Sequence, residues 1–260
     1  MSDVDDRPQL GLQLFTLRSS GEGLLRLLPR VAALGYRGVE LYGGQLADVD
    51  PDDARTVLNQ VGLTVPSALA GLSAAGRFDE DELERLQAIG VEHVVVPLLW
   101  VDQFADADSV AAAAERLNGA QAQLARRGLV LGYHNHHWEL TPLDDGRPAL
   151  LHLFERLDPA AVAEVDLYWV HVAGVDPAAL VGELGDRARL LHVKDGPGDD
   201  PSAPQVALGE GALALAAALQ AASSATWHHV ELDQFDGDAW APVVASADYL
   251  SDLGLTRCGR

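Results

Sequence analysis

The sequence predicts an α/β protein built as a single closed (β/α)8 barrel, and three observations support this prediction. Short apolar or β-branched segments alternate with longer segments of helical spacing along the whole chain, without a break in composition. No glycine-rich phosphate-binding motif follows the first apolar segment, which disfavours a doubly wound sheet. The 260 residues are close to the roughly 250 residues typical of an α/β barrel. We therefore expect one TIM barrel domain over residues 1–260.

Eight segments are expected to be strands, because they are short, apolar or β-branched and bounded by turn residues. In chain order they are Leu10–Phe15, Gly38–Tyr42, Thr64–Leu69, His93–Pro97, Val130–Asn135, Val162–Asp166, Arg189–Lys194 and His229–Leu232.

Eight further segments have the apolar spacing of helices. They are Gly23–Leu34, Asp52–Val61, Asp79–Ile89, Ser109–Arg127, Ala149–Leu157, Pro177–Leu184, Gly211–Ala222 and Trp240–Leu253. Gly35, Gly62, Gly90 and Gly128 precede the next strand, where a left-handed helix stop is expected. The polar segment Asp195–Leu208 is interpreted as a solvated loop, with a mobile flap as the alternative.

Composition excludes several classes of partner. The net charge of -21 and the pI near 4.5 surround the molecule with a field that repels nucleic acid and anionic membranes. No stretch approaches the ~20 apolar residues that a membrane span requires. Cys258 is the only cysteine and has no internal disulfide partner, and the first residues lack the pattern of a signal peptide. These features predict a cytoplasmic protein.

Ligand-type side chains gather at four successive strand ends, and active sites of such barrels lie at the carboxyl ends of the strands. One side chain from each of these strands gives His134, Asp166, His192 and Glu231. This set of two nitrogen and two oxygen donors suits Mn²⁺, Co²⁺, Zn²⁺ or Fe²⁺ better than Mg²⁺. His136 shares a strand face with His134, so the sequence leaves open which of the two is the fourth ligand.

These residues can also be interpreted without a metal site. A single polar residue at a strand end often caps a helix or bonds a loop, and residues 134–137 are also compatible with a surface cluster. The agreement among four strands favours the metal site. The other histidines are interpreted as surface or packing residues; they are His93, His152, His171, His228 and His229.

Further candidates surround the proposed ligands. Glu231 is the expected base, with His136 as a second catalytic candidate. Lys194, the only lysine, is expected to hold a substrate oxygen or donate a proton, the alternative being a salt bridge with Asp195 or Asp166. The residues expected to line the pocket and bind substrate are Gln13, Glu40, Glu139 and Trp169.

The chain resembles the sugar phosphate isomerase/epimerase superfamily, the xylose-isomerase-like TIM barrels. The segments that carry this resemblance are LGLQLFTLR, LGYRGVELYG, LGYHNHHWEL, EVDLYWVHVAGVDP, LLHVKDG and VELDQFDGDAWAPVVASADYLSDLGL. It implies that a divalent metal holds vicinal oxygens of a sugar while a C–H bond next to a carbonyl is broken. It also implies that Asp166, His192 and Glu231 are metal ligands.

One position departs from much of that family. Many epimerases similar to this chain have a glutamate that binds the metal and shuttles a proton where this chain has His134. Histidines in this strand make the chain similar to the branch that includes inosose dehydratase and enzymes acting on 3-keto sugars.

The expected function is therefore a metal-dependent isomerase or epimerase that acts on a ketose or keto sugar through a metal-stabilised enolate. The alternative is a lyase, dehydratase or 3-keto-glycoside-cleaving enzyme that uses the same enolate. A DNA-repair endonuclease of a related barrel type is disfavoured by the charge and by the number of ligands. A sugar-binding module without activity is the weakest option. The expected partner is a small sugar, and homo-oligomerisation is compatible with the sequence. The few basic residues near the strand ends disfavour a phosphorylated substrate.

Overall fold

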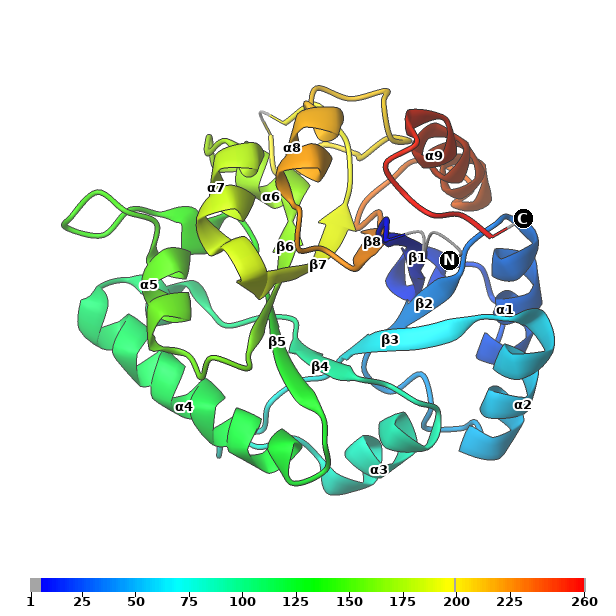
Figure 1. The fold of residues 1–260 in the computed structure, drawn as a ribbon, viewed down its shortest axis with the longest axis horizontal. Helices are drawn as coiled ribbons and strands as arrows, with labels where there is room; N and C mark the ends of the chain where they lie inside the picture. Colours follow the sequence, from blue (N-terminus) through cyan, green and yellow to red (C-terminus); the bar gives the residue numbers. More distant parts are fainter. Residues whose placement is uncertain (1–5, 199, 260) are drawn as a thin grey trace.

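The computed structural model describes residues 6–198 and 200–259, which form a closed barrel of eight parallel strands in sequence order (Figure 1). The strands are β1 (Gln9–Gln13), β2 (Gly38–Leu41), β3 (Thr64–Leu69), β4 (His93–Val96), β5 (Val130–His134), β6 (Val162–Asp166), β7 (Ala188–Val193) and β8 (Trp227–Val230). β1 pairs with both β2 and β8, which closes the barrel. The predicted fold class is confirmed.

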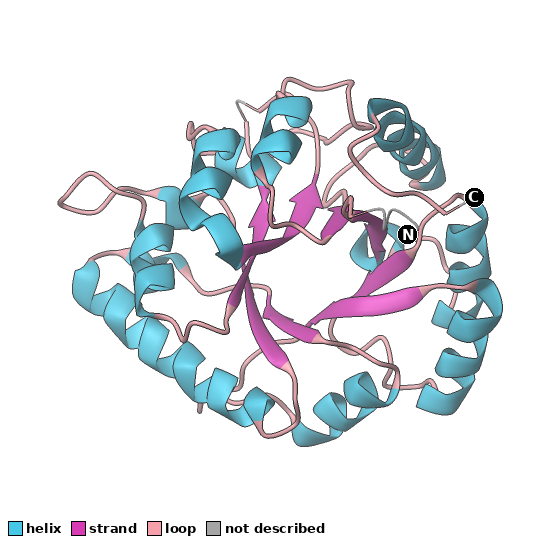
Figure 2. Cartoon of the chain, viewed as in Figure 1, coloured by secondary structure: helices cyan, strands magenta, loops and turns pink. Residues whose placement is uncertain are grey.

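Helices surround the strands (Figure 2). They are α1 (Leu24–Ala33), α2 (Pro51–Val61), α3 (Glu80–Ala88), α4 (Ala107–Ala125), α5 (Ala149–Arg156), α6 (Leu167–Val172), α7 (Pro177–Leu184), α8 (Leu215–Ala221) and α9 (Trp240–Leu253). Short 3-10 turns, among them Val101–Phe104 and Trp138–Leu140, lie in the loops that follow β4 and β5. No helix of the described residues is long and apolar enough to cross a membrane.

Local sequence signals explain where several helices begin and where the chain turns back. The carboxylates of Asp50, Asp79 and Asp106 accept hydrogen bonds from main-chain N–H groups in the first turns of α2, α3 and α4. The four glycines predicted to stop helices all have positive φ values, between 72° and 88°. These caps return the chain to the barrel in short αβ turns.

Several elements differ in their bounds from the sequence prediction, and β8 and α6 are two of them. β8 spans Trp227–Val230 instead of His229–Leu232, because Trp227 already pairs with Gln9 of β1 and Leu190 of β7. Helix α6 was not predicted, since its six residues are too few to show a helical period. Asp166 starts this helix by accepting a hydrogen bond from the main-chain N–H of Trp169 at 2.9 Å.

The barrel interior changes from apolar to polar towards the carboxyl ends of the strands. Trp227 packs inside with Val95, Val162 and Leu190. Its indole occupies the space where Gly38 has no side chain, because a Cβ there would lie 2.5 Å from the ring. His229 stacks on Trp227 with 5.7 Å between ring centroids, and it is fully buried. The polar layer of the barrel begins at this histidine.

The loop after β7 is held by one carboxylate. Asp195 is fully buried and accepts hydrogen bonds from the main-chain N–H groups of Gly196, Gly209, Gly211 and Leu213 at 2.9 to 3.2 Å. The expectation of a solvated loop over Asp195–Leu208 is therefore wrong at both ends of the segment, which are buried. The physical reason is that these N–H groups need an acceptor, and Asp195 supplies it inside the protein.

Candidate active site

Three of the predicted metal ligands lie together at the carboxyl end of the barrel. His134, Asp166 and His192 each offer one ligand atom, and these atoms lie within 4.8 Å of one another. Asp166 and His192 are register partners on β6 and β7, while His134 ends β5. Glu231 follows β8 directly, and its Oε2 lies 2.6 Å from His192 Nδ1. The strands therefore bring the four predicted ligands to one place.

The atoms of this group are suited to a divalent cation. His134 Nδ1 is buried and has no hydrogen-bond partner, while Asp166 Oδ2 and His192 Nδ1 lie in ion pairs with Lys194 and Glu231. Buried polar atoms are normally satisfied, so His134 Nδ1 is open to a bound group. Mixed nitrogen and oxygen donors are typical of sites for Zn²⁺ and the neighbouring transition metals. The residues fit the metal that the sequence predicted.

The ammonium group of Lys194 lies among three carboxylates. Its Nζ is 2.8 Å from Asp166 Oδ2, 2.8 Å from Glu231 Oε2 and 2.6 Å from Asp233 Oδ2. Burial opposes the charge of Lys194, but these carboxylates raise its pKa well above the ordinary value. The salt bridge between Lys194 and Asp166, which the sequence analysis gave as an alternative, is present. Asp195 instead accepts hydrogen bonds from main-chain N–H groups of its own loop.

The same charges set the protonation of the carboxyl groups. Burial disfavours the ionised form of Glu231, but the charges of Lys194 and His192 lower its pKa to about 2. For Asp166, burial outweighs the charge of Lys194 and raises the pKa to about 6. Glu231 is thus the carboxylate that stays ionised over the wider range of pH.

Glu40 lies underneath His192. It is fully buried, and its Oε2 is 2.8 Å from His192 Nε2. Ser67 Oγ donates to Glu40 Oε1 at 2.8 Å, and Gln13 Nε2 donates to Glu40 Oε2 at 3.3 Å. Glu40 and Gln13 were predicted to bind substrate. The structure places both beneath the predicted ligands, with their side chains bonded to protein groups.

Two residues that sequence reasoning passed over complete this lower layer. Glu164 and His229 form a second buried group with Glu40 and His192, with ligand atoms within 4.8 Å of one another. The interpretation of His229 as an ordinary surface or packing residue is therefore incomplete, because its ring lies inside the barrel. The alternation of side chains along β6 and β8 was the signal, since Glu164 shares a face with Asp166 and His229 with Glu231.

His229 and Glu164 also differ in charge from their neighbours. Burial lowers the pKa of His229 to about 4, so its ring is neutral at pH 7. Burial and the charge of Glu40 raise the pKa of Glu164 well above its usual value. In His192 the three nearby carboxylates outweigh burial and raise the pKa. Without a metal, the imidazole of His192 is thus the positive group of this layer, and a metal ligated by this ring would take the place of one of its protons.

His136 and Glu139 lie on the loop after β5. Glu139 is buried, accepts from Tyr133 Oη at 2.8 Å and from the main-chain N–H of His136 at 3.0 Å, and burial raises its pKa to about 7. The His136 ring stacks on Trp138 with 4.5 Å between centroids, and its centroid is 5.1 Å from that of His134. Burial lowers the pKa of His136 to about 3, which leaves a neutral ring beside the ligand group.

Asp233 joins the site to the loop after β7. Its Oδ2 accepts from Trp169 Nε1 at 3.2 Å and from Gln205 Nε2 at 3.4 Å, besides its contact with Lys194. Gln205 Oε1 in turn accepts from the main-chain N–H of Asp233 at 2.7 Å. Trp169, a predicted substrate-binding residue, thus lies within 5.9 Å of the Lys194 ammonium. Gln205 carried no signal in the sequence, because only the fold of the loop brings it to this end of the barrel.

The comparisons with known proteins agree with this architecture. The chain is 29% identical over 232 residues to a 2-epi-5-epi-valiolone 7-phosphate 2-epimerase from an Actinoplanes species, with 79% of each chain covered. A sugar phosphate isomerase/epimerase from Parabacteroides distasonis superposes with a TM-score of 0.79 at 20% identity, covering 98% of this chain and 97% of that one. The IolI protein, solved with a bound zinc atom, superposes with a TM-score of 0.71 at 17% identity, covering 94% and 97%.

A family model matches residues 28–250, most of the chain. The protein belongs to the xylose isomerase-like TIM barrel family.

Proposed function

We propose that the protein is a divalent-metal-dependent isomerase or epimerase that acts on a ketose or keto sugar. The observation that supports this most directly is the group of ligand atoms of His134, Asp166 and His192 within 4.8 Å of one another, beside Glu231. The group lies at the end of the barrel where such enzymes have their active sites. Similarity to an epimerase and to a zinc-containing barrel agrees with the proposal.

Glu231 is the proposed base. Removing a proton from a carbon next to a carbonyl requires an ionised acceptor, and the low pKa of Glu231 keeps its carboxylate ionised at pH 7. A weakly basic carboxylate needs an activated substrate, and a divalent cation held by these ligands would supply the positive charge that stabilises the enolate. Glu231 would then hold the proton at one of its carboxylate oxygens.

His136 is the second proposed proton carrier. Epimerisation needs a second group that exchanges a proton with the same carbon, and the His136 ring lies beside the ligand group, 5.1 Å from the His134 ring between centroids. His136 comes from the loop after β5, whereas Glu231 follows β8, so different elements supply the two groups. Stacking on Trp138 fixes the plane of the His136 ring.

A lyase or dehydratase is the second candidate, and the position of Lys194 favours it. The Lys194 ammonium lies 2.8 Å from Glu231 Oε2. In an elimination Glu231 would take the proton, and Lys194 would donate a proton to the hydroxyl that leaves the next carbon as water. The electrons of the broken C–H bond then form the C=C bond, which balances the reaction.

The experiment combines metal analysis with solvent exchange. Protein purified without chelator or affinity-tag metal is analysed by mass spectrometry for wild type, Asp166→Asn and Glu231→Gln. We expect near-stoichiometric Mn, Co, Zn or Fe in wild type and a loss of metal in both variants. Ketoses and keto sugars are then incubated in D₂O, where epimerisation introduces deuterium at the reacting carbon and elimination releases water. Wild type that stays free of metal after soaking in each ion would refute the proposal.

A further inference from the structure

We propose that the substrate is an uncharged sugar or polyol without a phosphate group. This inference rests on the proposed function, because it names the substrate class of the same site. It starts from the loop after β7, since TIM barrels that bind phosphorylated substrates frequently hold the phosphate with the loops after their seventh and eighth strands. In this chain the N–H groups of that loop already have an anionic acceptor.

The acceptor is Asp195. Its two carboxylate oxygens take hydrogen bonds from four main-chain N–H groups, those of Gly196, Gly209, Gly211 and Leu213. Convergent main-chain N–H groups form the usual nest for a phosphate. The fit to the carboxylate is tight, because a Cβ on Gly211 would lie under 3.0 Å from the Asp195 side chain. A substrate phosphate would therefore have to displace a buried carboxylate of the chain itself.

Side-chain cations at this end of the barrel are also engaged. The described loops that follow the strands contain four basic side chains. Lys194 is surrounded by the three carboxylates described above. Arg18 donates to the carbonyl oxygens of Phe15 and Asp233 and lies over the Phe15 ring, 3.9 Å from its centroid.

The other two arginines of these loops pair with glutamates of neighbouring helices. Arg77 lies 3.5 Å from Glu80 Oε1, and Arg147 lies 2.6 Å from Glu155 Oε1. A phosphate dianion is normally bound by arginine or lysine in charge-assisted hydrogen bonds. Each basic side chain of the described loops already pairs with a group of the protein.

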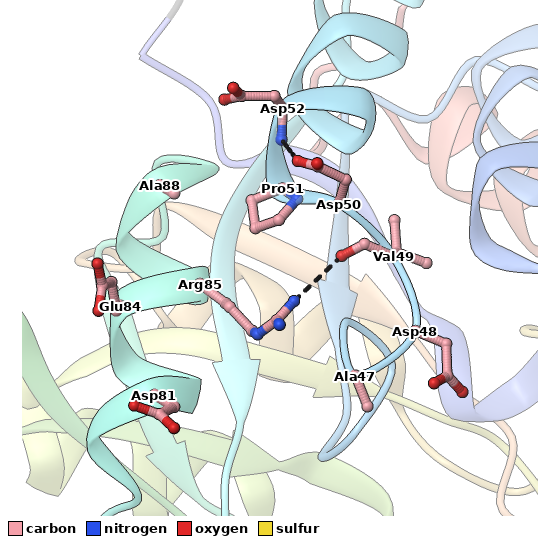
Figure 3. Close-up of a pocket in the computed structure, with 10 residues that line it drawn as sticks. All are labelled: Ala47, Asp48, Val49, Asp50, Pro51, Asp52, Asp81, Glu84, Arg85 and Ala88. Atoms are coloured by element: carbon pink, nitrogen blue, oxygen red, sulfur yellow. Dashed lines mark hydrogen bonds between the residues drawn. The ribbon is translucent and has the colours of Figure 1, made fainter.

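The outer surface near β2 and α3 is also negatively charged. A cavity of about 730 Å³ lies between the loop after β2 and helix α3, and its lining includes Asp48, Asp50, Asp52, Asp81 and Glu84 (Figure 3). Arg85, which also lines this cavity, donates hydrogen bonds to the main-chain carbonyl oxygens of Leu46 and Val49. Together with the net charge of -21, this surface repels a dianion and has no such effect on a neutral sugar.

This inference separates the chain from the similar epimerase, whose name specifies a 7-phosphate substrate. A neutral polyol would instead meet hydroxyl-binding groups such as the Asp233 carboxylate, the Gln205 amide and the Lys194 ammonium. These groups pair with one another at 2.6 to 3.4 Å, and hydroxyl groups can both donate to and accept from them.

The first test is phosphate binding by the metal-loaded wild-type protein. Inorganic phosphate is titrated and followed by ³¹P NMR and calorimetry, and we expect no binding tighter than a Kd of about 10 mM. A Kd below about 1 mM would overturn the inference, whatever the enzyme's activity. The same titration on Asp195→Asn, which removes the internal anion, should give at least about tenfold tighter binding than wild type. Asp236→Asn, which removes an equal charge from the loop after β8, serves as the control.

The second test uses matched substrates. Solvent deuterium exchange is measured for D-fructose against D-fructose 6-phosphate and for D-ribulose against D-ribulose 5-phosphate. We expect kcat/KM to be at least about 100-fold higher for each neutral sugar. Faster exchange with the phosphorylated partners would overturn the inference while supporting the proposed function. Absence of exchange with all ketoses and keto sugars would count against the proposed function, and the phosphate titration would then decide the inference alone. If Asp195→Asn does not fold, the two wild-type measurements remain decisive.

Discussion

Oε2 of Glu40 lies 2.8 Å from Nε2 of His192, while Nδ1 on the other edge of that ring lies 2.6 Å from Oε2 of Glu231. A carboxylate on one ring nitrogen of a metal-binding histidine orients the ring and holds a proton on that nitrogen. A metal bound at Nδ1 would replace the proton between Nδ1 and Glu231. Glu40 therefore orients His192 from below, and Ser67 and Gln13 in turn hold Glu40 by hydrogen bonds.

The variant Glu40→Gln should weaken metal binding. An amide is a poorer acceptor than a carboxylate, so the hydrogen bond that keeps the proton on Nε2 of His192 would weaken. We expect the affinity for Zn²⁺ to fall about 10- to 100-fold, measured by competition with a chelator. Glu139→Gln makes the same change at a buried glutamate that has no contact with His192, and it should leave the affinity nearly unchanged. Equal losses in both variants would argue against a positioning role for Glu40.

Replacing Lys194 by methionine should make the protein depend on metal for its stability. The substitution leaves the carboxylates of Asp166, Glu231 and Asp233 without their shared counter-ion, and breaking a buried pair costs roughly 3–5 kcal/mol. We expect a lower midpoint of urea unfolding in the presence of EDTA, and a larger gain on adding Zn²⁺ than in wild type. Equal stabilisation of the variant and the wild type by Zn²⁺ would contradict the role of Lys194 as the counter-ion of these carboxylates.

Alanine in place of Gly11 should disturb the barrel interior. A Cβ at this position would lie under 3.0 Å from the His229 ring, which packs between β1 and Trp227. We expect a loss of about 1–3 kcal/mol in the free energy of unfolding. Gly119→Ala is the matched control, because Gly119 lies inside α4 with nothing within 4 Å of the added atom. There the same change should stabilise the protein by roughly 0.5–1 kcal/mol. Similar effects at both positions would be inconsistent with the packing described.

Stability should fall in acid partly because of His228. Burial lowers the pKa of this ring to about 3, and its Nδ1 pairs with Thr256 Oγ1 at 2.8 Å. The unfolded chain, with a histidine pKa near 6.5, binds a proton that the folded protein excludes. The stabilisation is thus present above pH 6.5 and is lost as the pH falls towards 3. At pH 5 this single group removes about 2 kcal/mol.

The variant His228→Gln tests this linkage. Its free energy of unfolding, measured by urea denaturation at pH 8 and pH 5, should change less with pH than that of wild type. His152→Gln removes a histidine that pairs with Asp145 on the outside of the protein, and it serves as the control for a histidine outside the core. A slope unchanged by His228→Gln would show that this ring is protonated without cost in the folded protein.

The barrel and much of its site follow from short-range patterns. The bounds predicted for β3, β6, α7 and α9 agree with the structure, because period-two and helical spacing are properties of neighbouring residues. The same alternation, with the rule that barrel sites lie at the carboxyl ends, predicts the grouping of His134, Asp166, His192 and Glu231. These residues come together because parallel strands align their ends.

What the sequence could not decide depends on contacts between distant segments. The contact between Glu40 and His192 arises because closure of the barrel brings β2 and β7 to one interior. The N–H groups of Gly209 and Gly211 find their acceptor in Asp195 only because the loop after β7 folds back onto that residue, which the sequence does not indicate. The amino-acid sequence thus determined the strands, the helices and the polar residues at the strand ends. Closure of the barrel determined which group pairs with each buried charge. Burial makes an unpaired charge costly, so that choice is made by packing in three dimensions.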